Sequence, residues 1–213
     1  IEDDRDQSPL ILPLVTYNRQ SVIGRFGSSS NFNASSVMMT RKDGNNTRRF
    51  SLDGGWHLPL IGRRGDITKI SMTGRGDLYH VRNLTLDQAQ VKYTGFTSRF
   101  RPQIKANWRL PLARQHGKVS QTLEPIASAI ISPYGGNFAK IPNEESISME
   151  FDDTNLFSDN VFTGHDRVEG GPRLKYGLKW GLIGSNGGYT TAFLGQRYRP
   201  KDDNTFIEGS GLE

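Results

Sequence analysis

The sequence contains no cysteine, which excludes disulfide bonds and thiolate metal sites. Apolar residues are also scarce, at 34% of the 213 residues, and no apolar run approaches the roughly 18 residues of a membrane-spanning helix. A helical membrane protein is therefore excluded. A membrane β-barrel suits this low apolar content, because half of the residues in each of its strands can face water.

The start of the chain, Ile1-Glu-Asp-Asp4, lacks the basic end and the apolar core of a secretory signal peptide, so we expect a mature chain or an excised piece. Sequence motifs for catalysis are absent too. The four histidines are scattered, and no Gly-x-Ser-x-Gly, His-Glu-x-x-His or phosphate-loop spacing occurs. The sequence thus predicts no enzyme, no cofactor and no metal site.

The charge is unbalanced in the basic direction. The formal net charge is +5 at pH 7, which suits phosphate-bearing partners such as nucleic acid or anionic lipid. The sign of the charge alone does not choose between these partners.

The clearest pattern is the strict alternation of apolar and polar residues from Phe50 to Leu60. Such a stretch, extended as a strand, has one apolar face and one polar face. Its end, Trp56-His-Leu-Pro-Leu60, recurs as Trp108-Arg-Leu-Pro-Leu112, and Trp180-Gly-Leu182 is a shorter echo. Each copy leads directly into a tight polar turn.

The same alternation extends along the chain and predicts about eight strands. Short turns alternate with mostly longer connections, as in an outer-membrane barrel. The predicted fold is therefore all-β, an antiparallel up-and-down meander that forms part of the wall of a transmembrane barrel over residues 1–213. The predicted strands are 10–17, 25–40, 47–60, 66–79, 100–112, 119–131, 172–182 and 189–198, with long loops at 81–98 and 133–170.

The three tryptophans all lie on the apolar parity, a few residues before a short turn. Trp56, Trp108 and Trp180 would then form an aromatic girdle at one membrane interface. A soluble antiparallel sandwich alternates in the same way against a protein core, so periodicity leaves that fold open. Several strands do reach the ~9–11 residues that a tilted spanning strand needs.

Part of the sequence resembles a known family. The similar segments are Thr122-Leu-Glu-Pro125, the stretch from Leu156 to Arg167, and the strands around 174–178 and 195–198. They resemble the barrel of the lipopolysaccharide-assembly outer-membrane proteins, the LptD or organic solvent tolerance family. The most specific element is Phe-x-Gly-x-Asp-Arg, formed here by Phe162, Gly164, Asp166 and Arg167.

This resemblance implies a location in the cell outer membrane and a large barrel that inserts lipopolysaccharide into the outer leaflet. It also implies a plug lipoprotein inside the barrel (LptE-type), a periplasmic bridge protein (LptA-type), contact with outer-membrane lipids, and no nucleic acid. The chain has neither the family's cysteines nor a visible closing strand, so we expect an internal slice of the barrel wall.

On this interpretation the polar parity faces the lumen, where basic residues outnumber Asp53, Asp77 and Glu124. They could bind lipopolysaccharide phosphates through charge-assisted hydrogen bonds, or they could only solvate the wall and pair with neighbouring strands. The candidate phosphate-binding residues are Arg49, Lys69, Arg75, Arg101, Lys105, Arg109, Arg173, Lys175 and Lys179.

The Phe-x-Gly-x-Asp-Arg element ends a long loop just before a strand. A buried Asp–Arg pair there could pin the loop against the barrel mouth or a plug partner, or the element could be loop structure alone. Two other functions remain open: a small self-closed, porin-like barrel whose first and last strands pair, and a soluble carbohydrate-binding β-sandwich.

Overall fold

The computed structural model describes residues 10–21, 23–86, 91–146 and 156–201. These residues form one antiparallel sheet and a single short 3₁₀ turn, η1 (Arg25–Gly27). No helix among them is long and apolar enough to cross a bilayer. The strands are β1 (Leu10–Gln20), β2 (Ser29–Thr40), β3 (Asn46–Ile61), β4 (Ile67–Leu86), β5 (Val91–Arg109), β6 (Leu112–His116), β7 (Val119–Ile131), β8 (Arg173–Gly184) and β9 (Tyr189–Tyr198).

The sheet is a meander in which each strand pairs with its neighbours in sequence. The spatial order is β1-β2-β3-β4-β5-β7-β8-β9, and β6 continues the β5 side of the ladder along β7. The predicted all-β antiparallel meander is thus confirmed.

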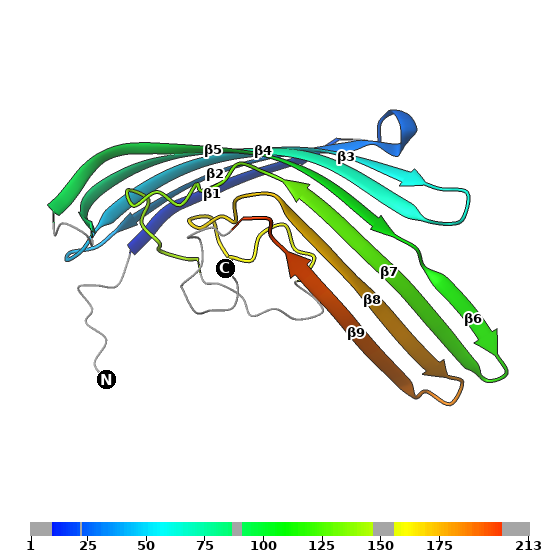
Figure 1. Ribbon diagram of the computed structural model, residues 1–213. Coiled ribbons are helices and arrows are strands. Elements are labelled where there is room, and N and C mark those ends of the chain that lie inside the picture. The colour runs from blue at the N-terminus through cyan, green and yellow to red at the C-terminus, as the bar shows by residue number, and fades with distance from the viewer. Residues whose placement is uncertain (1–9, 22, 87–90, 147–155, 202–213) are drawn as a thin grey trace, which may run out of the picture.

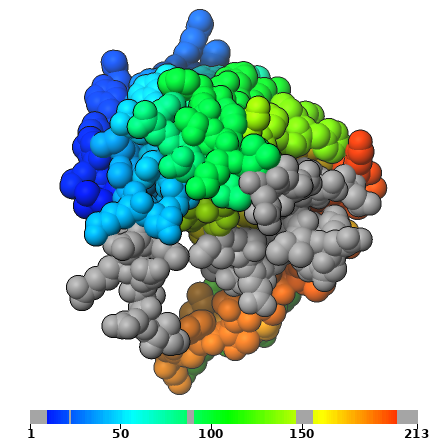
Figure 2. All heavy atoms as spheres, turned by 90° about the vertical axis from the view of Figure 1, so that its left-hand side faces the viewer, coloured from blue at the N-terminus to red at the C-terminus, as the bar shows by residue number. Residues whose placement is uncertain are grey.

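The sheet bends into an arch that is open on one side. Strands β1 to β5 form one limb and β7 to β9 the other (Figure 1). Viewed from the end, the blue first strands and the orange last strands lie on opposite sides of the molecule (Figure 2). Strand β1 pairs only with β2, and β9 only with β8, so the described strands form neither a self-closed barrel nor a second sheet of a sandwich.

The two faces of the sheet have an inverted character. On the outer, convex face the large apolar side chains are exposed: Phe50 is 45% and Phe100 73% accessible. On the inner, concave face polar side chains are buried: Arg49 is 5% and Asp77 3% accessible. A water-soluble protein has the opposite arrangement, since burial of apolar surface stabilises it.

The concave face is covered by the chain's own connection between β7 and β8. This segment, of which 132–146 and 156–172 are described, lies beneath the arch in Figure 1. We call the part from 156 to 171 the inner loop. A small apolar cluster of Tyr79, Val81 and Ile141, with Leu84 against it, packs where the segment meets β4.

The prediction of a long loop over 81–98 is wrong. Strand β4 continues to Leu86 and β5 begins at Val91, so β4 and β5 form a hairpin of 20 and 19 residues. The pairing register shifts between Val81 and Leu84, and Asn83 has a positive φ of 58°. Such a bulge inserts one residue, so odd-numbered positions face inward before it and even-numbered positions after it. The predicted alternation of apolar and polar residues therefore breaks down there.

The ends of two other predicted strands also differ. The strand expected over 100–112 is divided: β5 ends at Arg109 and β6 begins at Leu112, on either side of Leu110 and Pro111. Leu110 still donates its N–H to the Pro125 carbonyl, 3.1 Å away. The strand expected from residue 25 begins only at Ser29, after η1, where Phe26 has a positive φ.

Candidate functional site

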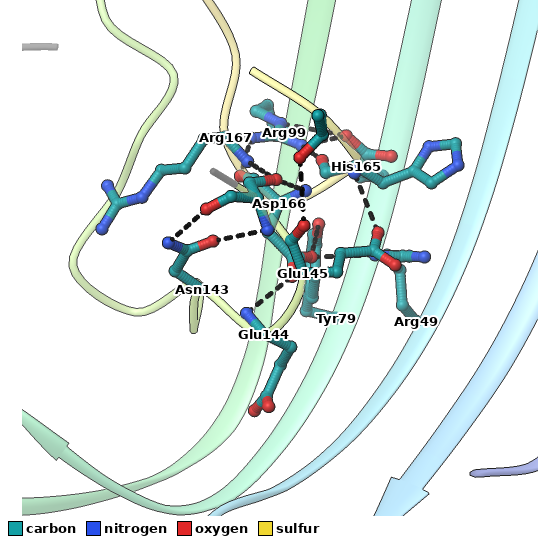
Figure 3. A network of polar contacts seen from close by, with 12 residues as sticks. Arg49, Tyr79, Arg99, Asn143, Glu144, Glu145, His165, Asp166 and Arg167 are labelled. Carbon is teal, nitrogen blue, oxygen red and sulfur yellow. Dashed lines mark hydrogen bonds and ion pairs between the residues drawn. The ribbon is translucent and has the colours of Figure 1, made fainter. Parts of the chain in front are cut away.

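The inner loop is attached to the concave wall first through Asp166, which is 2% accessible. Its Oδ1 accepts hydrogen bonds from Arg49 Nη1 at 2.8 Å and from the Tyr79 hydroxyl at 3.1 Å. Its Oδ2 accepts the backbone N–H of Glu144 at 2.9 Å. One carboxylate thus joins β3, β4 and both described parts of the β7–β8 connection (Figure 3).

A second contact is made by arginines that are held by Asp77. Arg75 and Arg99 both form ion pairs with the Asp77 carboxylate, at 2.9 and 2.6 Å. Arg99 Nη2 then donates to the carbonyl of His165 at 2.6 Å, and its Nη1 to the carbonyl of Asp166 at 2.8 Å. Asp77 therefore orients two guanidinium groups that bind the backbone of the inner loop.

The turn at Gly164 depends on the absence of a side chain. Gly164 has a φ of +66°, and a Cβ there would lie 2.7 Å from Glu145 Cγ. This space lets Glu145 Oε1 accept both Arg49 Nη1, at 2.6 Å, and the backbone N–H of His165, at 2.8 Å. Glycine is thus required both for the left-handed backbone and for the approach of Glu145.

Two ionisable groups of this turn have shifted pKa values. Burial acts to raise the pKa of Glu145, but the hydrogen bond and charge of Arg49 outweigh it and lower that pKa below its ordinary value. Burial, aided by the charges of Arg75 and Arg49, lowers the pKa of His165. Both shifts favour a docked loop with Glu145 charged and His165 neutral.

The second buried carboxylate of the inner loop is Glu169, which is 0% accessible. It forms ion pairs with Arg173, at 3.2 Å from Nε, and with Arg197. Its carbonyl accepts Arg101 Nη1 at 3.0 Å. Glu169 thus holds the end of the loop against β5, β8 and β9.

The beginning of the inner loop meets two lysines of the wall. Lys105 Nζ donates to the Phe157 carbonyl at 3.1 Å and pairs with Asp159 at 2.5 Å. Lys175, which is fully buried, donates to the Ser158 carbonyl at 2.5 Å. Leu156 is also buried, and the ring of Phe157 packs edge-on against that of Phe193, with 6.2 Å between the ring centroids.

On the other face, the tryptophans lie in a regular stagger. Trp56 is opposite Met72, which is opposite Ile104, and Trp108 follows four residues later on β5. Trp108 is opposite Ala127, which is opposite Tyr176, and Trp180 again follows four residues later. If the three indoles lie at one height, two residues per strand correspond to a strand tilt of roughly 54°, which is steeper than the ~35–45° of outer-membrane barrels.

A family model described as "LptD: LPS transport system D" matches residues 1–213, the whole chain. The chain belongs to the LptD family. Among curated relatives, the LPS-assembly protein LptD of Polaromonas sp. is 28% identical over 62% of this chain and 16% of its own length. The LptD of Albidiferax ferrireducens is 33% identical over 41% of this chain and 11% of its own length. That of Escherichia coli O1:K1 is 28% identical over 75% of this chain and 21% of its own length. The chain spans about a fifth or less of these relatives.

The element by which the sequence resembles the LptD family lies at the Asp166 contact. Gly164 forms the turn, and the partner of Asp166 is Arg49 on β3 rather than its neighbour Arg167. Arg167 contributes its backbone, whose N–H donates to Ser146 Oγ at 3.0 Å and whose carbonyl accepts Asn160 Nδ2 at 3.2 Å. The Phe162 carbonyl accepts the same amide at 3.1 Å.

The basic residues that the sequence singled out all lie on the concave face, in two groups. One group contacts the inner loop or the 133–146 segment before it: Arg49, Arg75, Arg101, Lys105, Arg173 and Lys175. The other group makes no hydrogen bond to the described part of that connection: Lys69, Arg109 and Lys179. Arg109 lies 3.6 Å from Glu124, and Lys179 lies over the ring of Phe193.

Sequence reasoning missed several residues of this site. The predicted loop over 81–98 places Arg99 at the end of a strand. In the structure Arg99 lies within β5, on the same face as Arg101. Glu145 and Glu169 lie in an irregular segment where no periodicity marks a buried carboxylate. Among the described residues, no group of three or more His, Asp and Glu side chains could hold a metal ion.

Proposed function

We propose that this chain is a section of the wall of an outer-membrane barrel that takes part in lipopolysaccharide transport. Its convex face contacts membrane lipid and its concave face lines the passage. The single observation that supports this most is the inverted distribution of residues, with exposed apolar side chains outside and a buried ionic network inside.

The height of the convex apolar band fits one bilayer. On β4 the convex positions from Thr68, opposite Trp108, to Leu78 carry no charged side chain, and the next two, His80 and Arg82, are polar. The uncharged positions are Thr68, Ile70, Met72, Gly74, Gly76 and Leu78. This band is 68–78, and a tilted strand needs ~9–11 residues to cross the hydrocarbon. The band therefore has the length of a single bilayer crossing, and the indole of Trp108 lies at the end nearest the short turns.

The concave face presents cations in adjacent rows of the sheet. Lys69, Asn107, Ser128, Lys175 and Arg197 lie directly opposite one another on successive strands. The next row brings Lys105 and Arg173 to either side of Ile130. Arg and Lys in such rows can bind the phosphates of a glycolipid by charge-assisted hydrogen bonds. We assign this role to Arg49, Lys69, Arg75, Arg101, Lys105, Arg109, Arg173, Lys175 and Lys179.

The same proposal includes the partners of the whole assembly. The concave face would meet a plug lipoprotein, and a periplasmic bridge protein would deliver the lipopolysaccharide. Both lie outside this chain, which covers a small part of its relatives. The free edges of β1 and β9 are the places where further wall strands would pair.

Photo-crosslinking in the full-length protein tests the assignment of the two faces. Neighbouring residues on one strand provide matched pairs: Arg109 with Trp108 on β5, and Lys179 with Leu178 on β8. Members of a pair lie at one height but on opposite faces. A crosslinker at Arg109 or Lys179 should capture lipopolysaccharide, whereas one at Trp108 or Leu178 should capture bulk lipid.

The contrast within each pair decides the result, because depth and expression are matched. Equal capture of lipopolysaccharide from both faces would refute the proposed topology. Capture of bulk lipid at Arg109 and Lys179 would show that the concave face is not the passage.

A further inference from the structure

We propose that the inner loop is a displaceable cover whose own oxygen atoms occupy a phosphate-binding site on the concave wall. A phosphorylated ligand and the loop would then compete for the same cations. This inference rests on the proposed function, since it concerns the state of the same lining residues.

The first support is the kind of acceptor that the loop provides. Lys175 is bound to a backbone carbonyl, that of Ser158, and Arg101 to that of Glu169. Arg173, which is also ion-paired with Glu169, donates to the carbonyls of Asp159 and Gly171, at 2.6 and 3.0 Å. A neutral carbonyl satisfies a donor but does not neutralise its charge. An ionised acceptor makes a bond roughly twice as strong, so a phosphate would replace these carbonyls favourably.

The second support is the crowding of like charges. Lys105 and Arg173 lie one strand apart across Ile130, and Lys175 follows Arg173 on the same face of β8. Burial strengthens the repulsion between these like charges. The loop offsets it with Asp159 beside Lys105 and Glu169 beside Arg173, and it gives Lys175 only the Ser158 carbonyl. A phosphate carries about −1.5 to −2 charges and three strong acceptor oxygens, which matches several cations in adjacent rows.

The third support is the way in which the loop is attached. It adds no strand to the sheet. It is held at Asp166 and Glu169, by hydrogen bonds from wall side chains, and by hydrogen bonds to Asn137 and Ser146 of the segment before it. Its removal would therefore leave every strand pairing intact. The bonds that Lys175, Arg101 and Arg173 give up when the loop leaves can be replaced by phosphate oxygens, so that release and ligand binding are coupled.

Hydrogen exchange in the full-length protein, isolated with its natural partner, tests this competition. Inorganic pyrophosphate serves as the probe, with sodium chloride at equal ionic strength as the screening control. Pyrophosphate should accelerate amide exchange in 156–171 while the amides of β7 and β8 stay protected. Sodium chloride should have a much smaller effect.

Charge-neutral variants locate the site. Glu169→Gln removes the charge that pairs with Arg173 and Arg197 and so weakens the hold of the loop. The pyrophosphate concentration for half-release should fall about tenfold. Glu124→Gln removes a carboxylate from the same face without touching the loop, and should leave that concentration unchanged. Lys175→Met should raise it.

A comparison of lipopolysaccharide with its dephosphorylated form identifies the source of the phosphate. Release by the phosphorylated form alone supports a glycolipid ligand, and release by pyrophosphate alone supports a soluble phosphate. The inference is overturned if no phosphate probe accelerates exchange, if sodium chloride does so equally, or if β7 and β8 lose protection together with the loop. The crosslinking contrast between the two faces can succeed in all of these cases, so the two proposals fail separately.

Discussion

The concave wall has two regions that carry similar basic residues but differ in how far these residues are buried and hydrogen-bonded. Towards the long connection, Arg49, Arg99 and Arg173 are buried and each has several acceptors. Towards the short turns, the side chain of Arg109 is 51% accessible and its nearest carboxylate is 3.6 Å away. The face of the sheet is the same in both regions, so the difference comes from the β7–β8 connection that covers only one of them, and from Asp77 beside it.

This difference shows what decides whether a basic residue of the wall holds the loop or is accessible to a ligand. A buried guanidinium is stable only with its hydrogen bonds satisfied. The inner loop supplies part of these acceptors, and Asp77 of the wall and Glu145 of the preceding segment supply the rest. An exposed one is solvated and gains little from a nearby carboxylate. The same residue type can thus fix a loop in one region and remain free for a passing ligand in the other.

The largest test of this comparison is the removal of the Asp166 carboxylate. Asp166→Ala leaves Arg49, the Tyr79 hydroxyl and the Glu144 N–H without their common acceptor. Loss of one partner of a buried ion pair costs about 3–5 kcal/mol. We expect the loop to become accessible, measured as faster hydrogen exchange over 156–171.

Glu124→Gln is the matched change in the open region. The pair that it breaks is long and partly exposed, so stability should change by less than ~1 kcal/mol. Equal effects of the two variants on loop exchange would mean that burial does not distinguish the two regions.

A smaller effect is expected from a methyl group at Gly164. Gly164→Ala adds a Cβ that meets Glu145 at 2.7 Å, in a left-handed backbone. The conformation costs about 1–2 kcal/mol, and the steric conflict about 1–3 kcal/mol more. Gly187→Ala is the control, since its φ is also positive but nothing lies within 4 Å. Limited proteolysis of the loop should increase in the first variant only.

The smallest effect is a pH dependence confined to the loop-covered region. The lowered pKa of Glu145 makes docking stable above the ordinary carboxyl range and weaker as pH falls through the docked value. The lowered pKa of His165 acts in the same direction, because protonation below the ordinary imidazole range favours the undocked loop.

Acidification should therefore first weaken docking through His165 and then, at lower pH, through Glu145. Loop exchange measured against pH, corrected for the intrinsic rate, gives the two steps. His165→Asn should remove the first step and Glu145→Gln the second. A loop whose protection increases in acid would contradict both assignments.

Much of the sheet could be predicted from the sequence, because a half-polar strand must alternate. Phe50, Trp56 and Trp108 share one parity and lie on the convex face for that reason. The predicted strand pattern differs from the structure at the Asn83 bulge and at the break between Arg109 and Leu112. Only a change of parity in the sequence marks the bulge.

The candidate site was less accessible to sequence reasoning. The basic side of the wall follows from periodicity, and Gly164 and Asp166 from the family element. That Asp166 pairs with Arg49, far away in the sequence, depends on how the loop folds back under the arch. Contacts made by irregular backbone leave no period in the sequence, so Glu145 and Glu169 could not be distinguished from solvated acids.

The hairpin of β4 and β5 is about twice as long as one bilayer crossing requires. On the proposed topology, β4 continues from His80 to Leu86 beyond the uncharged band, roughly 20 Å along the tilted strand at ~3.3 Å per residue. The end of this hairpin would therefore lie in water, outside the part of the wall that contacts lipid. An epitope fused beside Arg82 or Lys92 would stand in water on one known side, and it would report the orientation of the chain without entering the passage.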